Sequence, residues 1–389
     1  MFKRFSFILV QEYQILVLAV MLSYRKAFAA GVAASCLFNS ATAAPASSSV
    51  VNQTTCNGQQ YIYRELAGYG FIPSNARDKY GDTLGGIGSS IALDKSSWKK
   101  KGNAYTGTLW ALPDRGWNTE GTLNYQNRVH KVRITLTPNT TASVASPSGP
   151  NLQLQYLDTV LFTDPSGQPV SGLDPDAHGP YLTFPGFPQL PSATYTGDGF
   201  GGSGPGGRRV SIDSEGLVLA ADGSFWVSDE YGPYIYHFSS SGRMLSAIAP
   251  PNAILPIRNS TVSFSANSPP RYDPNITIIP ENPVTGRANN QGFEGLTVSP
   301  SGRDLYVLLQ SATDQEGGLK SSARRYTRFL HYDISCSPPR YVSEYIVPLP
   351  LYTNAANNTR IAAQSEIHYI SSTQFLVLAR DNPCASIPV

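Results

Sequence analysis

The sequence predicts an all-β protein, a β-propeller of four-stranded antiparallel blades that is incomplete at its C-terminal end. Three observations favour this fold class. A hairpin pattern recurs along the chain, further strand-like segments follow it, and no convincing helical periodicity appears outside the N-terminal region. The composition agrees, because Gly (34) and Pro (30) are frequent and only 14% of residues are charged, against roughly 25% in an average domain.

One hairpin pattern occurs three times. Its copies are "SEGLVLAADGSFWVSDE" at 214–230, "FEGLTVSPSGRDLYVLLQS" at 293–311 and "SEIHYISSTQFLVLARDN" at 365–382. Each has a Glu near its start, then an apolar strand, a turn and a second apolar strand. A looser copy at 88–93 and 108–116 has Ser89 in place of the Glu and a Lys-rich loop between its strands. Asp222 and Ser301 are interpreted as turn formers only.

Further strand-like segments follow these hairpins. "NRVHKVRITL", "YIYHF" and "RFLHYDI" predict third strands, and "LQLQYLDTVLF", "MLSAIA" and "YVSEYIVPL" predict fourth strands. Four antiparallel strands per repeat are typical of propeller blades, and a β-sandwich is the alternative. The last copy stops after two strands. We therefore expect an open ring, with residues 60–66 available as an outer strand for the last blade.

The N-terminus has the features of a secretory signal peptide. A basic pair precedes an apolar stretch, and Ala41-Thr42-Ala43 forms a small-residue cleavage site. We expect translation to start at Met21. A membrane anchor over residues 5–22 is the alternative, but three polar residues interrupt that stretch. The expected organisation is a signal region at 1–44, a short linker at 45–60, the propeller domain at 61–382 and an irregular tail at 383–389.

Other features agree with a secreted, glycosylated protein. N-x-S/T sequons stand at Asn52, Asn139, Asn259, Asn275 and Asn357. Three cysteines follow the signal region, so at most one intrachain disulfide can form, and we expect it between Cys56 and Cys336 with Cys384 left over. The net charge of +2 gives no field that favours nucleic acid or an anionic membrane. We expect a monomer without a stable membrane anchor.

Hairpin geometry predicts which polar residues meet. The start of a first strand lies beside the end of its second strand, and the first strand of a propeller blade is the innermost. The expected neighbours are Glu215 with Asp229 and Glu230, Glu294 with Gln310, Glu366 with Arg380 and Asp381, and Ser89 with Asp114 and Arg115. All of them should gather around the mouth of the central channel.

Converging carboxylates repel one another unless a cation or an arginine lies among them. Oxygen ligands of this kind suit Ca²⁺, and arginines suit a phosphate or carboxylate on the substrate. The roles we assign are catalysis for Glu230, Asp229 and Asp114, substrate binding for Arg115 and Arg380, and Ca²⁺ ligation for Glu215, Glu294, Glu366 and Asp381. The alternative is structural, since acids at blade starts can accept hydrogen bonds from the next blade.

Two other motifs carry weaker signals. "LDPDAHGP" places Asp174, Asp176 and His178 at alternate positions, which could bind a metal, but a polar loop is the favoured interpretation. "GDGFGGSGPGG" lacks the spacing of a phosphate-binding loop and is interpreted as a flexible surface loop. His237 and His331 occupy equivalent third-strand positions, where packing is the expected role.

Several motifs together resemble a known family. "GGIGSSIAL", "LPDRGWN", "SEGLVL", "WVSDEYGPYIYHFSSSGRML", "NQGFEGLTVSPSGRDLYVLLQSA" and "VLARD" are similar, in this order, to the secreted phytase-like proteins, whose domain is called esterase-like activity of phytase. The resemblance covers roughly residues 61–382. It implies a β-propeller whose Glu and Asp residues hydrolyse phosphoesters or esters. The family continues with further strands where this chain has "PCASIPV".

The leading hypothesis is therefore a secreted hydrolase of a small phosphate ester or other ester, dependent on Ca²⁺. A lactonase-like or strictosidine-synthase-like propeller enzyme is a second reading, because those proteins also place acids around an axial metal. A third is a secreted binding propeller or an inactive truncated product without enzymatic activity.

Overall fold

The structure is a computed structural model that describes residues 6–11, 14–19, 52–56, 58–63, 67–84, 86–143, 146–354 and 356–380. The chain divides into two compact units. One consists of Met1–Phe71, Lys100–Thr106 and Thr135–Leu154, and the other of Ile72–Lys99, Gly107–Ile134 and Gln155–Val389. All residues of the candidate site lie in the second unit.

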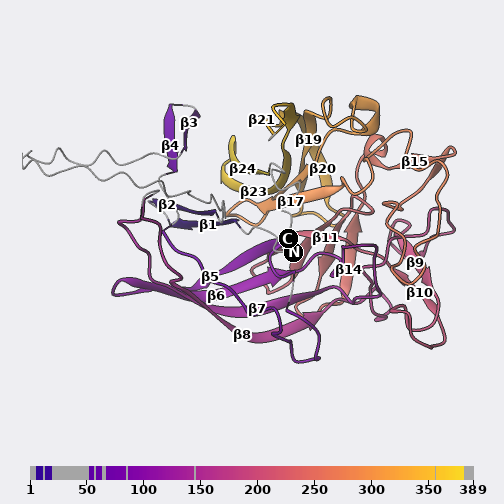
Figure 1. The fold of residues 1–389 in the computed structure, drawn as a ribbon, viewed down its shortest axis with the longest axis horizontal. Coiled ribbons are helices and arrows are strands. Elements are labelled where there is room, and N and C mark those ends of the chain that lie inside the picture. The colour runs from indigo at the N-terminus through magenta and orange to yellow at the C-terminus, as the bar shows by residue number, and fades with distance from the viewer. Residues whose placement is uncertain are drawn as a thin grey trace, which may run out of the picture. The chain divides into compact units, whose positions relative to one another are not determined.

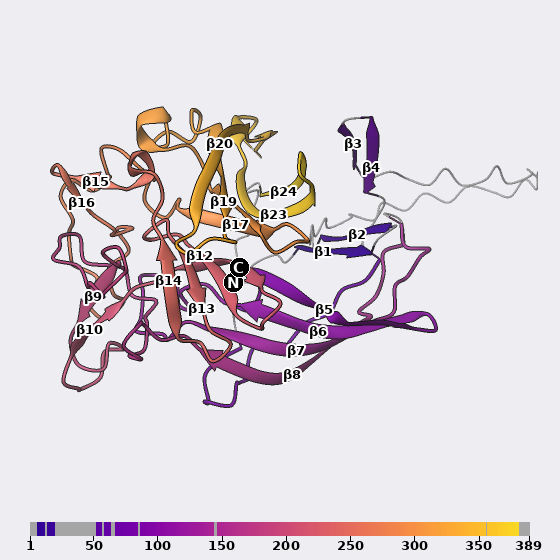
Figure 2. The ribbon, with the colours of Figure 1, turned by 180° about the vertical axis from the view of Figure 1, so that it is seen from behind.

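Three four-stranded antiparallel sheets carry the predicted repeats, and in each the spatial order of the strands follows the chain. The first sheet contains β5 (Ser90–Lys101), β6 (Ala104–Leu112), β7 (Arg128–Leu136) and β8 (Leu152–Leu161). Figures 1 and 2 show it from opposite sides as a run of long, twisted strands. The Lys-rich segment expected to be a loop instead forms the outer part of β5 and turns into β6 at Gly102–Asn103.

The other two sheets are built in the same way. The second contains β11 (Ser214–Leu219), β12 (Phe225–Asp229), β13 (Ile235–Phe238) and β14 (Met244–Ile248), and the third contains β17 (Phe293–Val298), β18 (Asp304–Leu309), β19 (Tyr326–Asp333) and β20 (Arg340–Pro348). The last repeat forms the two-stranded sheet of β23 (Ala363–Ser371) and β24 (Gln374–Arg380). Strand β17 packs against both β11 and β23 (Figure 1). The fold is thus all-β and consistent with a propeller-like arrangement.

The remaining described elements are short. Paired strands are β1 (Ser6–Gln11) with β2 (Gln14–Ala19), β3 (Asn52–Cys56) with β4 (Gln59–Tyr63), β9 (Ser192–Tyr195) with β10 (Gly207–Val210), β15 (Ile257–Arg258) with β16 (Thr261–Val262) and β21 (Leu351–Thr353) with β22 (Thr359–Ile361). Two single-turn 3₁₀ helices, η1 (Asn252–Ile254) and η2 (Asp314–Glu316), lie in connections. The described residues contain no helix long and apolar enough to cross a membrane.

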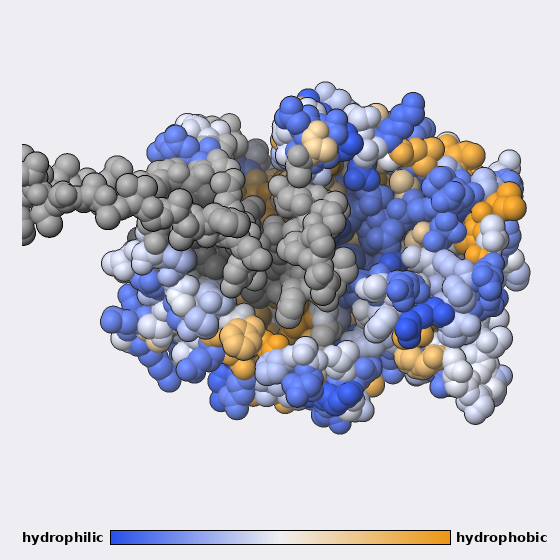
Figure 3. Space-filling view, viewed as in Figure 1, coloured by the Kyte–Doolittle hydropathy of each residue, from blue (hydrophilic) through white to orange (hydrophobic). Residues whose placement is uncertain are grey.

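Apolar side chains of neighbouring repeats form the core. Leu217, Phe225 and Phe238 of the second sheet are buried against Phe162, whose ring stacks on Phe238 at 4.2 Å. At the far end of the hairpin, Asp222 accepts hydrogen bonds from the backbone and hydroxyl of Ser224, as expected of a turn residue. On the face in Figure 3, hydrophilic residues cover most of the coloured surface and apolar ones form small separate patches.

The third-strand histidines occupy equivalent packed positions, as predicted. His237 stacks on Trp226 at 4.2 Å and shares a hydrogen bond with Ser224. His331 stacks on Tyr306 at 4.5 Å and lies 2.9 Å from Asp304. The repeats therefore share side-chain packing as well as strand order.

Some expectations are wrong. Strand β4, which begins the segment expected to extend the last blade, pairs with β3 instead. Cys336 is exposed and has a free thiol, so the expected bond to Cys56 is not formed. Its Sγ lies 3.7 Å from Oδ2 of Asp333. The proposed cleavage site, residues 64–66 and the tail at 383–389 lie outside the described residues.

Candidate active site

The glutamate that opens each hairpin lies at a β-bulge. The register between first and second strands shifts between Ser214 and Leu217 in the second sheet, and between Phe293 and Leu296 in the third. A shift also falls between Gln364 and Glu366 in the last sheet. A bulge leaves a residue outside the ladder and redirects side chains. Glu215 and Glu294 therefore lie inside the irregularity, whereas Glu366 directly follows it and pairs with Leu378.

A glycine follows the glutamate in two copies because the neighbouring inner strand approaches closely. A Cβ atom on Gly216 would lie 2.5 Å from the carbonyl oxygen of Glu294, and one on Gly295 would lie 2.6 Å from the nitrogen of Ile367. Neither position can hold a side chain without moving backbone. The motif Glu-Gly thus couples a redirected carboxylate to tight packing between repeats.

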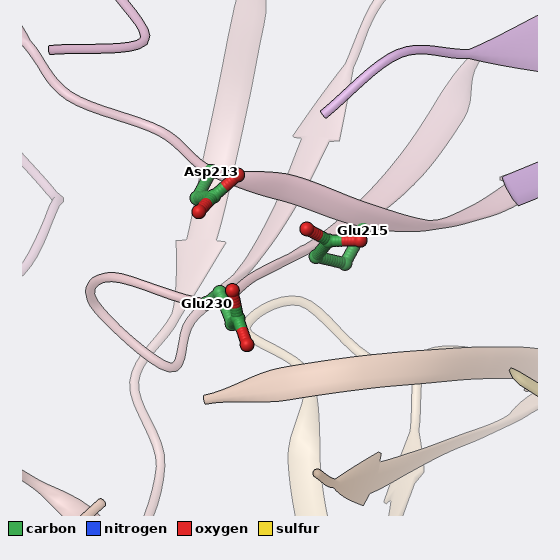
Figure 4. Close-up of side chains that lie close together, drawn as sticks. All are labelled: Asp213, Glu215 and Glu230. Carbon is green, nitrogen blue, oxygen red and sulfur yellow. The ribbon is translucent and has the colours of Figure 1, made fainter. Parts of the chain in front are cut away.

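Three carboxylates form a compact buried cluster at one end of the β11–β12 hairpin. Asp213 precedes β11, Glu215 lies in its bulge and Glu230 follows β12 directly; Figure 4 shows the three side chains around a common space. One oxygen of each lies within 4.8 Å of the other two. The exposed fractions are 2%, 6% and 1%. The backbone N–H of Glu230 donates to the carbonyl of Asp213 at 2.9 Å, which fixes the two segments together.

Glu230 lies in an environment that disfavours its charged form. Burial, followed by the charges of Glu294 and Asp213, raises its pKa well above the usual range, although Arg380 and Arg115 partly oppose the shift. Its Oε1 atom is buried and has no hydrogen-bond partner. A buried oxygen without a donor is costly, so this atom calls for a proton, a cation or a ligand.

Arg115 reaches the cluster from the loop after β6. Its backbone N–H donates to Oδ1 of Asp213 at 3.0 Å, and its Nη1 lies 3.3 Å from Oδ2 of the same residue. Nη1 also donates to Oδ1 of Asn290 at 2.8 Å. Burial alone would lower the pKa of Arg115, but Tyr231, Asp213 and Glu230 outweigh burial, so the pKa lies well above its usual value. The loop of the first repeat therefore lies beside the hairpin of the second, as predicted.

Glu294, Gln310 and Arg380 form a second group beside the cluster. Gln310 donates through Nε2 to Oε1 of Glu294, and Nη2 of Arg380 lies 3.2 Å from the same oxygen. The charge of Glu294 raises the pKa of Arg380. The side chain of Arg380 is 49% exposed while that of Glu294 is 4% exposed. A half-exposed guanidinium held by a buried carboxylate can still contact an anionic ligand.

Asp229 adopts a different geometry from its neighbour Glu230. Its Oδ1 accepts from the backbone N–H groups of Asp213 and Tyr231, both at 2.9 Å. Its Oδ2 accepts from the N–H of Gly232 at 3.0 Å and the hydroxyl of Tyr236 at 2.9 Å. Burial raises the pKa of Asp229 to about 7, against the effect of these donors. Four donors surround this carboxylate. Asp229 thereby holds in place the backbone segments that carry Asp213 and Glu230.

Glu366 connects inner strands. Its Oε2 accepts from the hydroxyl of Ser90 at 2.5 Å, and its Oε1 accepts from the N–H groups of Leu296 at 3.1 Å and Ile367 at 2.9 Å. Ser90 in turn accepts from the N–H of Leu217 at 3.0 Å. Four inner strands thus meet around one carboxylate. Burial raises the pKa of Glu366 to about 8.

Asp114 holds the loop that carries Arg115. Its Oδ1 accepts from the N–H of Gly116 at 2.9 Å and its Oδ2 from Nδ2 of Asn118 at 2.6 Å. The start of the first hairpin does lie beside this loop, because Gly88 donates to the carbonyl of Leu112 at 3.2 Å. Asp381 lies outside the described residues.

The structure adds three residues that the sequence interpretation missed. Asp213 completes the acidic cluster, Asn290 binds Arg115, and Arg324 lies close enough to Arg380 that burial and then this charge lower its pKa. Nε of Arg324 is buried without a partner. Asp213 stands two residues before Glu215 at the start of the hairpin, and this closeness in the chain was a usable signal. Comparison of the repeats hid it, because the equivalent positions are Gly292 and Gln364.

Among the described residues, only the Asp213–Glu215–Glu230 cluster has the geometry of a metal site. The "LDPDAHGP" segment is a polar loop instead. Asp174 accepts from Ser265, Ala266 and Ser268, and Asp176 accepts from the N–H and hydroxyl of Thr194.

Comparison with known proteins adds two findings. The family model described as "Phytase-like: Esterase-like activity of phytase" matches residues 83–385. The chain is also 56% identical over 339 residues to an "Uncharacterized secreted protein" of Arthroderma benhamiae. The aligned part covers 86% of this chain and 66% of that protein, so the chain spans just under two thirds of the relative's length.

Proposed function

The chain belongs to the phytase-like family (esterase-like activity of phytase), and on this premise we propose that it is a secreted hydrolase of phosphate esters. The observation that carries the proposal is the buried cluster of Asp213, Glu215 and Glu230, with oxygens within 4.8 Å of one another. Two arginines beside it, Arg115 and Arg380, supply the positive charge that a phosphoryl group requires.

The donor set fits Ca²⁺. All three groups are carboxylates, the ligand type that this ion prefers, and the unpartnered Oε1 of Glu230 supports the presence of a bound cation. Asp213, Glu215 and Glu230 would hold it. When bound, a divalent cation polarises phosphoryl oxygens and lowers the pKa of a coordinated water.

The chain's own residues would then divide the remaining work. Glu230 would contribute one carboxylate oxygen to the cation and would accept the proton of the attacking water through the other. Arg115 and Arg380 orient the phosphoryl group and offset its negative charge. Asp229 holds the backbone on both sides of the cluster through its bonds to Asp213 and Tyr231. Asp114 positions Arg115 through the bonds it makes within its loop.

The repeats support a propeller as the setting for this site. Successive sheets place their first strands together, as the packing of β17 against β11 and β23 illustrates. A signal peptide at residues 1–44 would direct export, in agreement with the secreted relative. Glycans at the sequons would agree with the same route.

The test is hydrolysis by the purified protein. We expect release of inorganic phosphate from phosphomonoesters, loss of activity with EDTA and recovery with Ca²⁺. The double variant Glu215→Gln, Glu230→Gln should be inactive, while Glu281→Gln, an exposed glutamate outside the site, serves as the matched control. Wild-type activity in the double variant would refute the assignment. Turnover of lactones or carboxylic esters without phosphatase activity would place the protein in another class of hydrolases.

A further inference from the structure

The loop that carries Asp114 and Arg115 also presents an exposed tryptophan. Trp117 is 41% exposed, although large aromatic side chains are usually well buried. It lies two residues after Arg115, and two residues of extended chain span at most about 7 Å. Since the backbone and the side chain of Arg115 both contact Asp213, the backbone of Trp117 lies close to the acidic cluster.

The loop holds Trp117 in a defined position. Asp114 accepts from Gly116 and Asn118 on either side of the tryptophan, and the indole Nε1 donates to the carbonyl of Thr119. Gly116 has φ of 84°, and a Cβ atom there would lie 2.5 Å from the ring of Tyr125. The backbone and the indole N–H are therefore both fixed before any ligand binds. Such a side chain offers contact area at little entropic cost.

A guanidinium from a distant segment supports the ring. Cζ of Arg271 lies 4.8 Å from the centroid of Trp117, a cation–π distance. The backbones are joined, because Thr122 donates to the carbonyl of Pro269 at 3.2 Å and Arg271 donates to that of Thr122 at 2.9 Å. Gly121 has φ of 109° and a Cβ there would lie 2.5 Å from the carbonyl oxygen of Pro269. The pair of Trp117 and Arg271 is thus built into the fold.

We propose that Trp117, supported by Arg271, binds the flat ring of the leaving group and makes the enzyme selective for ring-bearing phosphate esters over acyclic ones. The inference rests on the proposed function, since it assumes hydrolysis of a phosphate ester. The role of Trp117 is argued separately from its contacts with Arg271 and Thr119. An aromatic ring or the apolar face of a sugar ring can stack on indole, and the adjacent guanidinium favours leaving groups that are themselves anionic. A leaving group without a ring gains nothing from this surface.

The test compares kcat/KM for phenyl phosphate, glucose 6-phosphate and glycerol phosphate at saturating Ca²⁺. We expect Trp117→Ala to reduce the ratio of phenyl to glycerol phosphate roughly tenfold, chiefly through KM, as for the loss of one aromatic stacking contact. Trp117→Phe should restore part of the ratio, and Arg271→Ala should reduce it less than Trp117→Ala. Retention of the glucose 6-phosphate ratio in Trp117→Ala would assign the surface to aromatic rings, and its loss would extend the assignment to sugars.

The matched control is Tyr80→Ala, because Tyr80 is 54% exposed and lies under Lys79 at 5.0 Å without a contact to the cluster residues. An unchanged phenyl-to-glycerol ratio in Trp117→Ala, or an equal drop in Tyr80→Ala, overturns the proposal. If Trp117→Ala does not fold, the ratio in Trp117→Phe and Arg271→Ala decides. If the wild type hydrolyses no phosphate ester, the proposed function fails. Calorimetry with phenylphosphonate and methylphosphonate then decides the inference separately: tighter binding of the phenyl compound, lost in Trp117→Ala, supports it, and equal binding overturns it.

Discussion

The hydroxyl of Ser90 lies 2.5 Å from Oε2 of Glu366, so the first strand of the first repeat and the first strand of the last are joined by one hydrogen bond. The two residues are separated by 276 positions in the chain. Glu366 was expected to ligate Ca²⁺ because it opens its hairpin as Glu215 does. Its observed partners instead favour the structural alternative, in which such an acid fastens neighbouring repeats.

This arrangement predicts an unusual pH response for Glu366→Gln. The fold raises the pKa of Glu366 to about 8 from 4.5, so between these values the folded protein keeps a proton that the unfolded chain has lost. Stability from this group is therefore complete below pH 4.5 and is lost as the pH rises to about 8, by up to about 5 kcal/mol. Glutamine reproduces the protonated form and should be close to neutral at pH 5 but stabilising at pH 9. Urea unfolding at both pH values measures this, and a variant that is equally destabilised at both would contradict it.

Glu230→Gln should lower the activity while it leaves the melting temperature unchanged or raises it. Removal of a buried charge that faces Glu294 and Asp213 relieves repulsion, so the melting temperature without Ca²⁺ should stay the same or rise. Loss of the proton acceptor should reduce kcat by at least about 100-fold. Differential scanning calorimetry and phosphate release measure the two effects. A parallel fall in both quantities would show that Glu230 is a structural residue.

Asp229→Ala should act on stability. The change leaves three backbone N–H groups and the hydroxyl of Tyr236 without an acceptor. Each buried donor without a partner costs roughly 1–3 kcal/mol, so we expect a loss of about 4 kcal/mol or more in the free energy of unfolding. Asp229→Asn keeps one acceptor and should lose less. Full stability of the alanine variant, measured by denaturant unfolding, would contradict the observed hydrogen-bond geometry.

Asp213→Asn tests the cation site directly. Ca²⁺ that binds only the folded state should raise the melting temperature of the wild type in proportion to the logarithm of its concentration. The variant should lose most of that shift, whereas Asp176→Asn, which alters a polar loop away from the cluster, should retain it. Titration calorimetry gives the affinity in parallel. Equal Ca²⁺ stabilisation of Asp213→Asn and wild type would remove Asp213 from the ligand set.

Much of the fold could be predicted because the strand pattern is periodic. The four-strand order of three sheets, the two strands of the last repeat and the packed histidines all follow from repeated local patterns. The Lys-rich part of β5 could not, because a long exposed hairpin has the polar composition of a loop. The partners of β4 depended on a strand that the sequence did not suggest.

The sequence predicted which residues lie near one another in the site, but not where their side chains point. Hairpin geometry placed Glu215, Glu230 and Arg115 near one another, as observed. It could not distinguish Asp229, the last residue of β12, from Glu230, because side chains of adjacent residues at a strand end point into different surroundings. Arg324 comes from a long connection without periodic constraint, so nothing in the sequence fixed its place.

The two residues of the Glu-Gly bulge differ in how freely they can be substituted. The glycine cannot be replaced, because a Cβ atom would collide with the neighbouring inner strand. The glutamate side chain has no such constraint, and its partners differ from repeat to repeat. Two copies of this bulge, and a third bulge without the glycine, hold three carboxylates with different partners: one in an acidic cluster, one beside an amide and a guanidinium, and one at a junction of strands. The repeated hairpin therefore fixes the backbone, and the neighbours of each carboxylate decide its chemistry.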